Sequence, residues 1–336
     1  MTLPYLSATG MRGGYGKADI LHGCDIAVDK GQIAVIVGPN GAGKSTFLSA
    51  IAGDLRVDQG RILIGQTDVT GQSTWERARM VARVFQDPMA GTCEALTIEE
   101  NMALALERGR SRGLGRAIDR QTRELFRERL SILRLGLENR LTDRIGLLSG
   151  GQRQAVSLLM ASLRPSSILL LDEHTAALDP KTAAFVLELT ARIVAESRLT
   201  TLMVTHSMRQ ALDYGTRTVM LHQGRVIFDV QGEARARLDV PDLLAMFEKT
   251  RGEELADETA GLDRDLVIAI VRESYAGLAR SAKLTQHMIP LTERFARQRL
   301  ADLTRDREAG RPQVLFVCVA NAGRSQLAAA IVNRLA

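Results

Sequence analysis

One glycine-rich stretch constrains this chain more than any other. It consists of Gly38, Pro39, Asn40, Gly41, Ala42, Gly43, Lys44, Ser45 and Thr46. The pattern is G-x-x-x-x-G-K-S, preceded by the apolar run 32–37 and followed by a helical pattern over 47–52, which is the context that a phosphate-binding loop requires. Backbone N–H groups, the helix N-terminus and Lys44 suit phosphate oxygens, and the Ser45 hydroxyl suits Mg²⁺. The sequence therefore predicts a nucleotide-phosphate site.

Composition bounds the size and the class of the protein. The chain has 336 residues, of which 45% are hydrophobic and 25% charged, as expected for two globular domains or one domain with an appendage. Aromatic residues make up only 4%, so a surface that stacks nucleic-acid bases is not expected. The net charge of +5 is compatible with a nucleotide, a nucleic acid or an anionic membrane surface, and it selects none of them.

Cysteine usage and hydropathy bear on the compartment. The cysteines Cys24, Cys93 and Cys318 form no C-x-x-C pair and have no metal-ligand spacing, which predicts a reducing, cytoplasmic setting. No secretory leader is evident at the N-terminus, and no apolar run approaches the ~18 residues of a membrane span. We expect any action on a membrane to require a partner.

Apolar runs predict an α/β architecture for residues 1–249. Strands are expected at 6–11, 20–28, 32–37, 61–64, 81–85, 168–172 and 200–205, and in a hairpin around Gln223-Gly224. The run 168–173 is apolar until its two terminal carboxylates, which is typical of a strand buried on both faces of a parallel sheet. A helix over 181–196 separates it from the next strand, and this alternation predicts a parallel core. A helix over 123–135 is expected to stop at Gly136.

Three further segments follow. Residues 250–263 lose apolar density and are interpreted as a linker. Residues 264–310 have a helical pattern and predict a small α-helical segment. Residues 311–336 predict a strand, a loop and a helix, which is an incomplete α/β fragment.

The order of the motifs resembles the nucleotide-binding domain of ABC transporters, and the similarity covers roughly residues 3–249. The resemblance implies an α/β P-loop NTPase of the ABC type, with a mixed sheet core, an antiparallel β subdomain and a helical subdomain. It implies ATP and Mg²⁺ as cofactors. It also implies that Tyr15 stacks on adenine and that Gln86 couples Mg²⁺ and the attacking water to a membrane partner.

Residues 148–152, Leu-Ser-Gly-Gly-Gln, match the signature motif of that family. The resemblance implies that Ser149, Gly150 and Gly151 open a helix whose N–H groups bind the γ-phosphate of a nucleotide held by a second copy. The chain has one such motif and one phosphate loop. Two complete sites therefore need a head-to-tail dimer of these domains.

The remaining family positions follow the predicted strands. The resemblance implies that Asp172 holds Mg²⁺ through water, that Glu173 is the general base, and that His206 contacts the γ-phosphate. Asp179 lies in the D-loop, across which two domains communicate. His174 stands where the family mostly has proline, as in a subgroup associated with amino-acid-type importers. It is either a tolerated loop substitution or a residue that tunes hydrolysis.

The carboxyl end resembles a different family. Residues 314–325 are similar to the start of a low-molecular-weight tyrosine phosphatase or arsenate reductase, and the preceding helices resemble the three-helix extension of some reductases. That likeness implies a Cys318 thiolate nucleophile and an oxyanion clamp at Arg324. Only a strand, a loop and a helix are present, which cannot cover both faces of a parallel sheet, so no phosphatase turnover is expected.

These observations predict an ATP-hydrolysing subunit of an ABC importer for a small solute such as an amino acid. Its partners would be transmembrane permease subunits, a second copy of the domain and, indirectly, an extracytoplasmic solute-binding protein, with no nucleic acid. It would lie peripherally on the cytoplasmic face of the membrane. Two alternatives are a soluble ABC ATPase acting on ribosomes or DNA, and an anion-processing enzyme built on Cys318.

Overall fold

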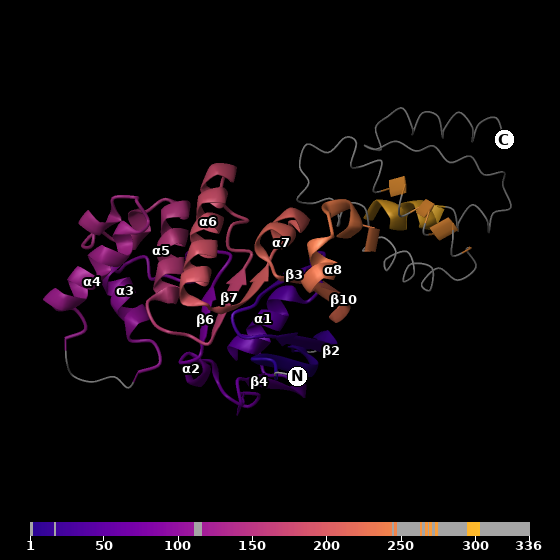
Figure 1. Ribbon diagram of the computed structural model, residues 1–336, viewed down its shortest axis with the longest axis horizontal. Coiled ribbons are helices and arrows are strands. Elements are labelled where there is room, and N and C mark those ends of the chain that lie inside the picture. The colour runs from indigo at the N-terminus through magenta and orange to yellow at the C-terminus, as the bar shows by residue number, and fades with distance from the viewer. Residues whose placement is uncertain are drawn as a thin grey trace. The chain divides into compact units, whose positions relative to one another are not determined.

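The chain divides into two units, Met1–Arg237 and Leu238–Ala336. The computed structural model describes residues 3–16, 18–110, 116–243, 245–246, 263, 266–267, 269–270, 273–274 and 294–302 (Figure 1). Helical residues 240–243 and 245–246 are thus grouped with the second unit, although the sequence assigned them to the first domain. The predicted fragment 311–336 lies outside the described residues.

A mixed six-stranded sheet forms the centre of the first unit. Its strand order is β10-β9-β3-β8-β7-β6. The strands are β3 (Ile33–Val37), β6 (Val81–Val84), β7 (Ile168–Asp172), β8 (Thr200–Val204), β9 (Arg217–His222) and β10 (Arg225–Gln231). All neighbours pair in parallel except β9 and β10, which form the predicted hairpin. Every residue of β7 and β8 is buried, as the apolar runs predicted.

A second, antiparallel sheet contains the N-terminal strands. Its order is β2-β1-β4-β5, with β1 (Leu6–Tyr15), β2 (Ala18–Val28), β4 (Gln59–Ile64) and β5 (Thr67–Asp68). Leu6 and Ile26 of this sheet share one buried cluster with Ile36 of β3 and Phe47 of the helix after the phosphate loop. The core therefore continues from one sheet to the other, and the mixed core with an antiparallel subdomain is confirmed.

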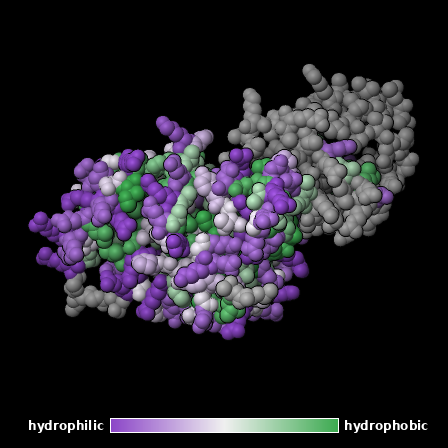
Figure 2. All heavy atoms as spheres, viewed as in Figure 1, coloured by the Kyte–Doolittle hydropathy of each residue, from purple (hydrophilic) through white to green (hydrophobic). Residues whose placement is uncertain are grey.

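Helices cover the central sheet and gather at one end of it. They are α1 (Lys44–Ala52), α2 (Thr74–Arg77), α3 (Ile98–Leu106), α4 (Arg120–Ser131), α5 (Gly150–Ser162), α6 (Pro180–Ser197), α7 (Met208–Tyr214) and α8 (Gly232–Ala236), with 3₁₀ turns η1 (Leu137–Asn139) and η2 (Ile145–Leu147). Figure 1 shows α3, α4 and α5 together at one end, and Figure 2 shows hydrophilic side chains there, where α4 carries its charged residues. None of the helices described is long and apolar enough to cross a membrane.

The predicted helix boundary at Gly136 is wrong. Helix α4 ends at Ser131, and Gly136, with a φ of 71°, begins η1 instead. The reason is that a glycine with positive φ starts a new turn as readily as it ends a helix. The short helices α2, α7 and α8 were not expected from the sequence.

The second unit is described in parts. Residues 294–302 are helical, as are short pieces between 266 and 274. The guanidinium of Arg299, which is buried, donates to the Ser274 hydroxyl at 3.0 Å and pairs with Glu273 at 2.9 Å. Val267, Ile270 and other apolar side chains of these helices are buried. Helical packing therefore occurs within the predicted helical segment 264–310.

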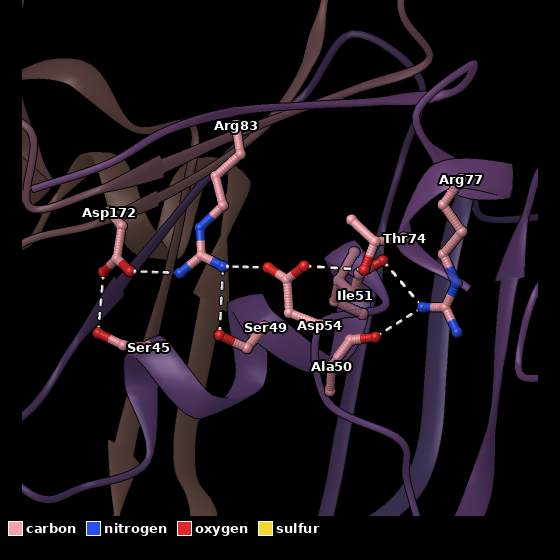
Figure 3. Close-up of polar contacts among 9 residues, drawn as sticks. All are labelled: Ser45, Ser49, Ala50, Ile51, Asp54, Thr74, Arg77, Arg83 and Asp172. Atoms are coloured by element: carbon pink, nitrogen blue, oxygen red, sulfur yellow. Dashed lines mark hydrogen bonds and ion pairs between the residues drawn. The ribbon is translucent and has the colours of Figure 1, made fainter. Parts of the chain in front are cut away.

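A buried arginine fixes the end of α1, the helix that follows the phosphate loop. Arg77 of α2 is only 1% exposed. Its Nη1 donates to the carbonyl oxygens of Ala50 at 2.6 Å and Ile51 at 3.0 Å (Figure 3). Its Nη2 donates to the carbonyl oxygen of Thr70 at 3.0 Å. A cation at the last carbonyls of a helix also complements the helix dipole.

Arg77→Met is expected to lower the free energy of unfolding by roughly 2–4 kcal/mol, because three carbonyl groups would lose a charged donor in a buried place. Chemical denaturation followed by far-UV circular dichroism measures this change. Arg129→Met on the exposed face of α4 serves as the control and should change stability by less than about 0.5 kcal/mol. Equal effects of the two substitutions would contradict the assigned role of Arg77.

Candidate functional site

The phosphate loop connects β3 to α1. Gly38 has a φ of 149°, and a Cβ there would lie 2.1 Å from the carbonyl oxygen of Leu221, so no larger residue fits. Gly43, with a φ of 95°, is the N-cap of α1 and brings no capping side chain. The first N–H groups of α1 are therefore open to an anion, which the helix dipole favours. The loop is buried at Gly38, Pro39, Ala42, Gly43, Lys44 and Thr46 and exposed at Asn40, Gly41 and Ser45.

A hairpin turn supports this loop from behind. Gly224, between β9 and β10, donates its N–H to the Ala42 carbonyl oxygen at 3.0 Å. The Gly224 carbonyl accepts from the His22 N–H and from the Cys24 thiol, both at 2.8 Å. Burial raises the pKa of Cys24 to about 11, so the thiol stays protonated and able to donate. The sequence indicated only a turn here, because nothing in a turn motif reveals a distant partner.

Lys44 and Glu173 form the charged centre of the site. The Lys44 ammonium donates to the carbonyl oxygens of Gly38 at 2.9 Å and Pro39 at 3.0 Å, and lies 3.6 Å from Glu173 Oε1. Burial lowers the pKa of Lys44, and the charge of Glu173 offsets part of this shift. A buried cation directed at the phosphate loop suits an anionic ligand.

His206 lies on the other side of Glu173. Its Nδ1 is 2.9 Å from Glu173 Oε1, the same oxygen that faces Lys44. Burial raises the pKa of Glu173, but the His206 hydrogen bond and the Lys44 charge outweigh burial, so the pKa lies below its ordinary value. Glu173 is therefore a carboxylate at neutral pH. Its φ of 44° is a left-handed conformation, which is strained for a residue other than glycine and is often found at functional sites.

Ser45 and Asp172 place two oxygen atoms beside the phosphate loop. The Ser45 hydroxyl donates to Asp172 Oδ1 at 2.9 Å, and Asp172 is the last residue of β7. No group of three or more His, Cys, Asp or Glu side chains in the described part of the chain could hold a metal. Mg²⁺ is commonly held by one or two carboxylates together with substrate phosphates and water, so this pair fits such a cation.

The signature residues make local contacts. Ser149 caps α5, accepting from the Gln152 N–H at 3.3 Å, and Asp179 caps α6, accepting from the Thr182 N–H at 3.1 Å. A Cβ on Gly151 would lie 2.0 Å from Thr182 Cγ2, so the glycine permits close packing of α5 on α6. In the described structure no hydrogen bond or ion pair joins Ser149, Gly150, Gly151 or Asp179 to the phosphate loop.

Two further predicted residues are exposed. Tyr15 ends β1 and is 53% exposed, and Gln86 follows the end of β6. The carbonyl of the preceding Phe85 accepts from Gln154 Nε2 of α5 at 3.0 Å, which ties this loop to the helical end of the unit. The structure thus brings together Lys44, Glu173 and His206, and the Ser45–Asp172 pair lies beside them. Tyr15 and Gln86 are exposed to solvent, where they can reach a ligand.

His174 faces away from this cluster, into the packing of α6. It is 1% exposed, and its Nε2 lies 3.0 Å from the Thr190 hydroxyl, which donates to the Val186 carbonyl at 2.7 Å. The Thr190 hydroxyl donates its only proton to the Val186 carbonyl, so toward His174 it can only accept. The His174 ring is therefore the donor and carries its proton on Nε2. Burial lowers the pKa of His174 to about 4, so the ring is neutral at physiological pH.

Arg83 is a site residue that the sequence did not single out. It lies on β6, and its Nη2 is 2.8 Å from Asp172 Oδ2. The available signal was a charge inside the otherwise apolar run 81–84, since a charge in a buried strand needs a partner.

Comparison with known proteins identifies the family. Residues 21–176 match the ABC transporter family. The tyrosine transport ATP-binding protein of Clostridioides difficile (strain R20291) is 43% identical over 235 residues, which are 70% of this chain and 93% of that protein. The thiamine import ATP-binding protein ThiQ of Salmonella choleraesuis (strain SC-B67) is 36% identical over 60% of this chain and 80% of that protein.

Solved structures have the same fold. MJ1267, an ATP-binding cassette of an ABC transporter, gives a TM-score of 0.62 at 25% identity over 73% of this chain and 99% of its own. The ATP-binding cassette MJ0796, in a dimeric post-hydrolysis state bound to ADP and Pi, gives a TM-score of 0.58 at 28% identity. The match covers 67% of this chain and 98% of that chain.

Fold and site define a P-loop nucleotide-binding protein. The chain belongs to the ABC transporter family, as an ATP-binding subunit with ATPase activity.

A second, shorter match covers residues 250–304, which resemble the N-terminal domain of the protein-tyrosine-phosphatase-like family. The predicted linker 250–263 lies within this match. Cys318 and Arg324 lie beyond it and outside the described residues, so the anion-binding loop stays a prediction.

His174 is expected to make the protein less stable in acid. Its pKa is lowered from 6.5 to about 4 in the folded state, so between these pH values the unfolded chain takes up a proton that the folded chain does not. The free energy of unfolding should therefore fall by roughly 3 kcal/mol through this residue as the pH decreases across that range. Urea unfolding of wild type and His174→Gln across the range measures this contribution. Parallel pH profiles of the two proteins would contradict it.

Proposed function

We propose that this chain is the ATP-hydrolysing subunit of an importer for a small solute such as an amino acid. The charged cluster of Lys44, Glu173 and His206 beside the Ser45–Asp172 pair carries the proposal, because it supplies a phosphate site, a base and metal ligands together. The name of one relative, a thiamine import protein, supports import. The name of another, a tyrosine transport protein, favours an amino acid as the solute. No observation favours the ribosome or DNA alternatives, and the phosphatase-like match at 250–304 does not include Cys318 or Arg324.

Nucleotide binding is assigned to the phosphate loop and to Tyr15. In the proposed complex, N–H groups at the start of α1 and the Lys44 ammonium bind the phosphates, and the exposed Tyr15 ring stacks on adenine. Ser45 and Asp172, joined by Gln86, would hold Mg²⁺, which neutralises charge on the β- and γ-phosphates when bound. Lys44 must then turn from the Gly38 and Pro39 carbonyls toward phosphate.

Glu173 accepts the proton of the attacking water in this proposal. Its low pKa keeps it ionised, while its hydrogen bond from His206 holds the carboxylate in place. When Lys44 turns to a phosphate, Glu173 loses part of the positive charge that depresses its pKa and becomes a better base. His206 is then placed to contact the γ-phosphate.

Each subunit provides half of a complete site. The N-terminus of α5 at Ser149, Gly150 and Gly151 is exposed or partly exposed and directs its helix dipole outward, and Asp179 lies exposed at the N-terminus of α6. We assign these residues to the nucleotide of a second copy, in a head-to-tail dimer. The dimeric state of MJ0796 bound to ADP and Pi supports this arrangement.

A groove on the first unit is the proposed contact with the permease. It has a volume of about 610 Å³ and is lined by side chains from β6, α3 and α5, with Phe85, Leu104 and Cys93 among them. Leu104 is 57% exposed, and the groove lies next to Gln86. A partner bound there would contact the loop that leads to Gln86. In this proposal the subunit lies peripherally on the cytoplasmic face of the membrane, and a solute-binding protein acts only through the permease.

Glu173→Gln is expected to bind ATP and dimerise but to hydrolyse it roughly 10²- to 10⁴-fold more slowly, because the amide cannot accept the proton. Adding Ser149→Arg should abolish the ATP-dependent dimer without changing ATP affinity, since each chain keeps its own phosphate loop. ATPase assays measure the turnover, calorimetry measures the ATP affinity, and light scattering measures the dimer. Undiminished turnover in Glu173→Gln would refute the assigned base.

Thr97→Arg is the matched control for Ser149→Arg. Thr97 caps α3 with the same reciprocal pattern, through Glu100, that Ser149 makes with Gln152. Its loss should weaken a helix by about 1 kcal/mol and leave the dimer intact. Loss of the dimer in both variants would show that capping, and not a contact with the second copy, is responsible.

The membrane partner can be tested on the intact complex. Affinity purification of the full chain from detergent-solubilised membranes should bring down a multi-span membrane protein, and cells lacking the subunit should lose uptake of tyrosine or a related amino acid. Leu104→Glu should abolish copurification while the isolated subunit still hydrolyses ATP, because a charge enters the groove. Leu3→Glu, at an exposed leucine outside the groove, is the control. Cosedimentation with ribosomes instead would overturn the proposal.

A further inference from the structure

Arg83 occupies an unexpected place for a charge. It lies in β6 between buried neighbours, with Ala82 and Val84 on either side, and pairs in register with the buried Leu170 of β7. Its side chain is only 12% exposed. A buried guanidinium requires several acceptors to offset the loss of water.

The guanidinium connects three structural elements. Nη2 is 2.8 Å from Asp172 Oδ2, while Nη1 donates to Asp54 Oδ2 at 2.8 Å and to the Ser49 hydroxyl of α1 at 3.2 Å (Figure 3). The ring of Phe85 lies 4.7 Å from the guanidinium carbon. Arg83 is thus held by groups on both sides and by an aromatic face, which leaves it little freedom to move.

This arrangement fixes the carboxylate of Asp172. With Oδ2 bound by Arg83, Oδ1 points to the Ser45 hydroxyl at 2.9 Å, on the side of the phosphate loop. A carboxylate that holds a metal, directly or through a coordinated water, holds it more tightly when its other oxygen is fixed by an outer hydrogen bond. Without Arg83, Asp172 would lose the partner of Oδ2 and would be a buried carboxylate free to rotate.

We propose that Arg83 is a positioning residue that orients Asp172 for a divalent cation bound with ATP. The inference rests on the proposed role of Ser45 and Asp172 as cation ligands. Arg83 also lines the groove proposed for the permease, so one residue borders the groove and contacts the cation ligand Asp172. Arg83 itself touches neither nucleotide nor cation.

A purely structural role for Arg83 predicts a different result. Arg83 bridges β6, β7 and α1, so its loss could simply loosen α1 and the phosphate loop. In that case ATP would bind more weakly with or without a cation. A positioning role changes only the cation-dependent part, because metal-free ATP depends on the loop N–H groups and Lys44.

The test uses Mn²⁺ as the probe, in full-length Glu173→Gln protein so that ATP is not hydrolysed. Electron paramagnetic resonance measures Mn²⁺ binding in the presence of ATP, and calorimetry with a chelator measures metal-free ATP binding. Arg83→Met should weaken Mn²⁺ binding by roughly tenfold, the lower end of the range for outer-shell partners, and should leave metal-free ATP affinity within about twofold. Arg83→Lys keeps the positive charge but not the planar guanidinium with its two donor nitrogens, and it should give a smaller loss of Mn²⁺ affinity.

Arg77→Met is the matched control, since Arg77 is a buried arginine that also binds α1 but does not contact Asp172. It should leave Mn²⁺ affinity within about twofold of the parent. Unchanged Mn²⁺ binding in both Arg83 variants, or a parallel loss of metal-free ATP binding, would overturn the proposal. A parent protein in which ATP gives no Mn²⁺ site would instead refute the assigned cation ligands. If Arg83→Met does not fold, Arg83→Lys decides alone.

Discussion

The parallel pairing of β3, β8 and β7 determines where the chemistry of this protein takes place. Ile36, Val204 and Asp172 lie in one row of the sheet, so the segments that follow these strands leave from the same edge. Those segments are the phosphate loop, the turn with His206, and the turn with Glu173. Side chains far apart in the sequence therefore meet without any local signal that they would do so.

The site concentrates charge where little water is present. Lys44, Glu173 and Asp172 are largely buried, and each has a charged or hydrogen-bonded partner before any ligand binds. Such charged pairs interact strongly in a low dielectric, and removing one partner from a buried pair is strongly destabilising. Binding of a phosphate would exchange the partners of Lys44 and so alter the basicity of Glu173. Two arginines, the buried Arg77 and the partly buried Arg83, hold the elements around this centre.

Backbone contacts with the β9–β10 hairpin shape and support the phosphate loop. Gly38 is required by the Leu221 backbone, and Gly224 supports the loop through Ala42. The hairpin of β9 and β10 thus serves the site although it carries no ligand. The signature residues lie at a separate helix end, and we assign them to the site of a second copy. Residues 250–304 also match the N-terminal domain of the protein-tyrosine-phosphatase-like family.

Motif order in the sequence was enough to determine the family, the mixed sheet with its antiparallel companion, and the candidate roles of Lys44, Glu173 and His206. Short-range patterns sufficed because glycine loops and buried strands are encoded by neighbouring residues, as the predicted strand over 168–172 shows. Only the tertiary structure decided that Arg83 holds Asp172, that Gly224 supports Ala42, and that His174 faces α6. These contacts join residues distant in the sequence, and the direction of a side chain depends on how whole elements pack.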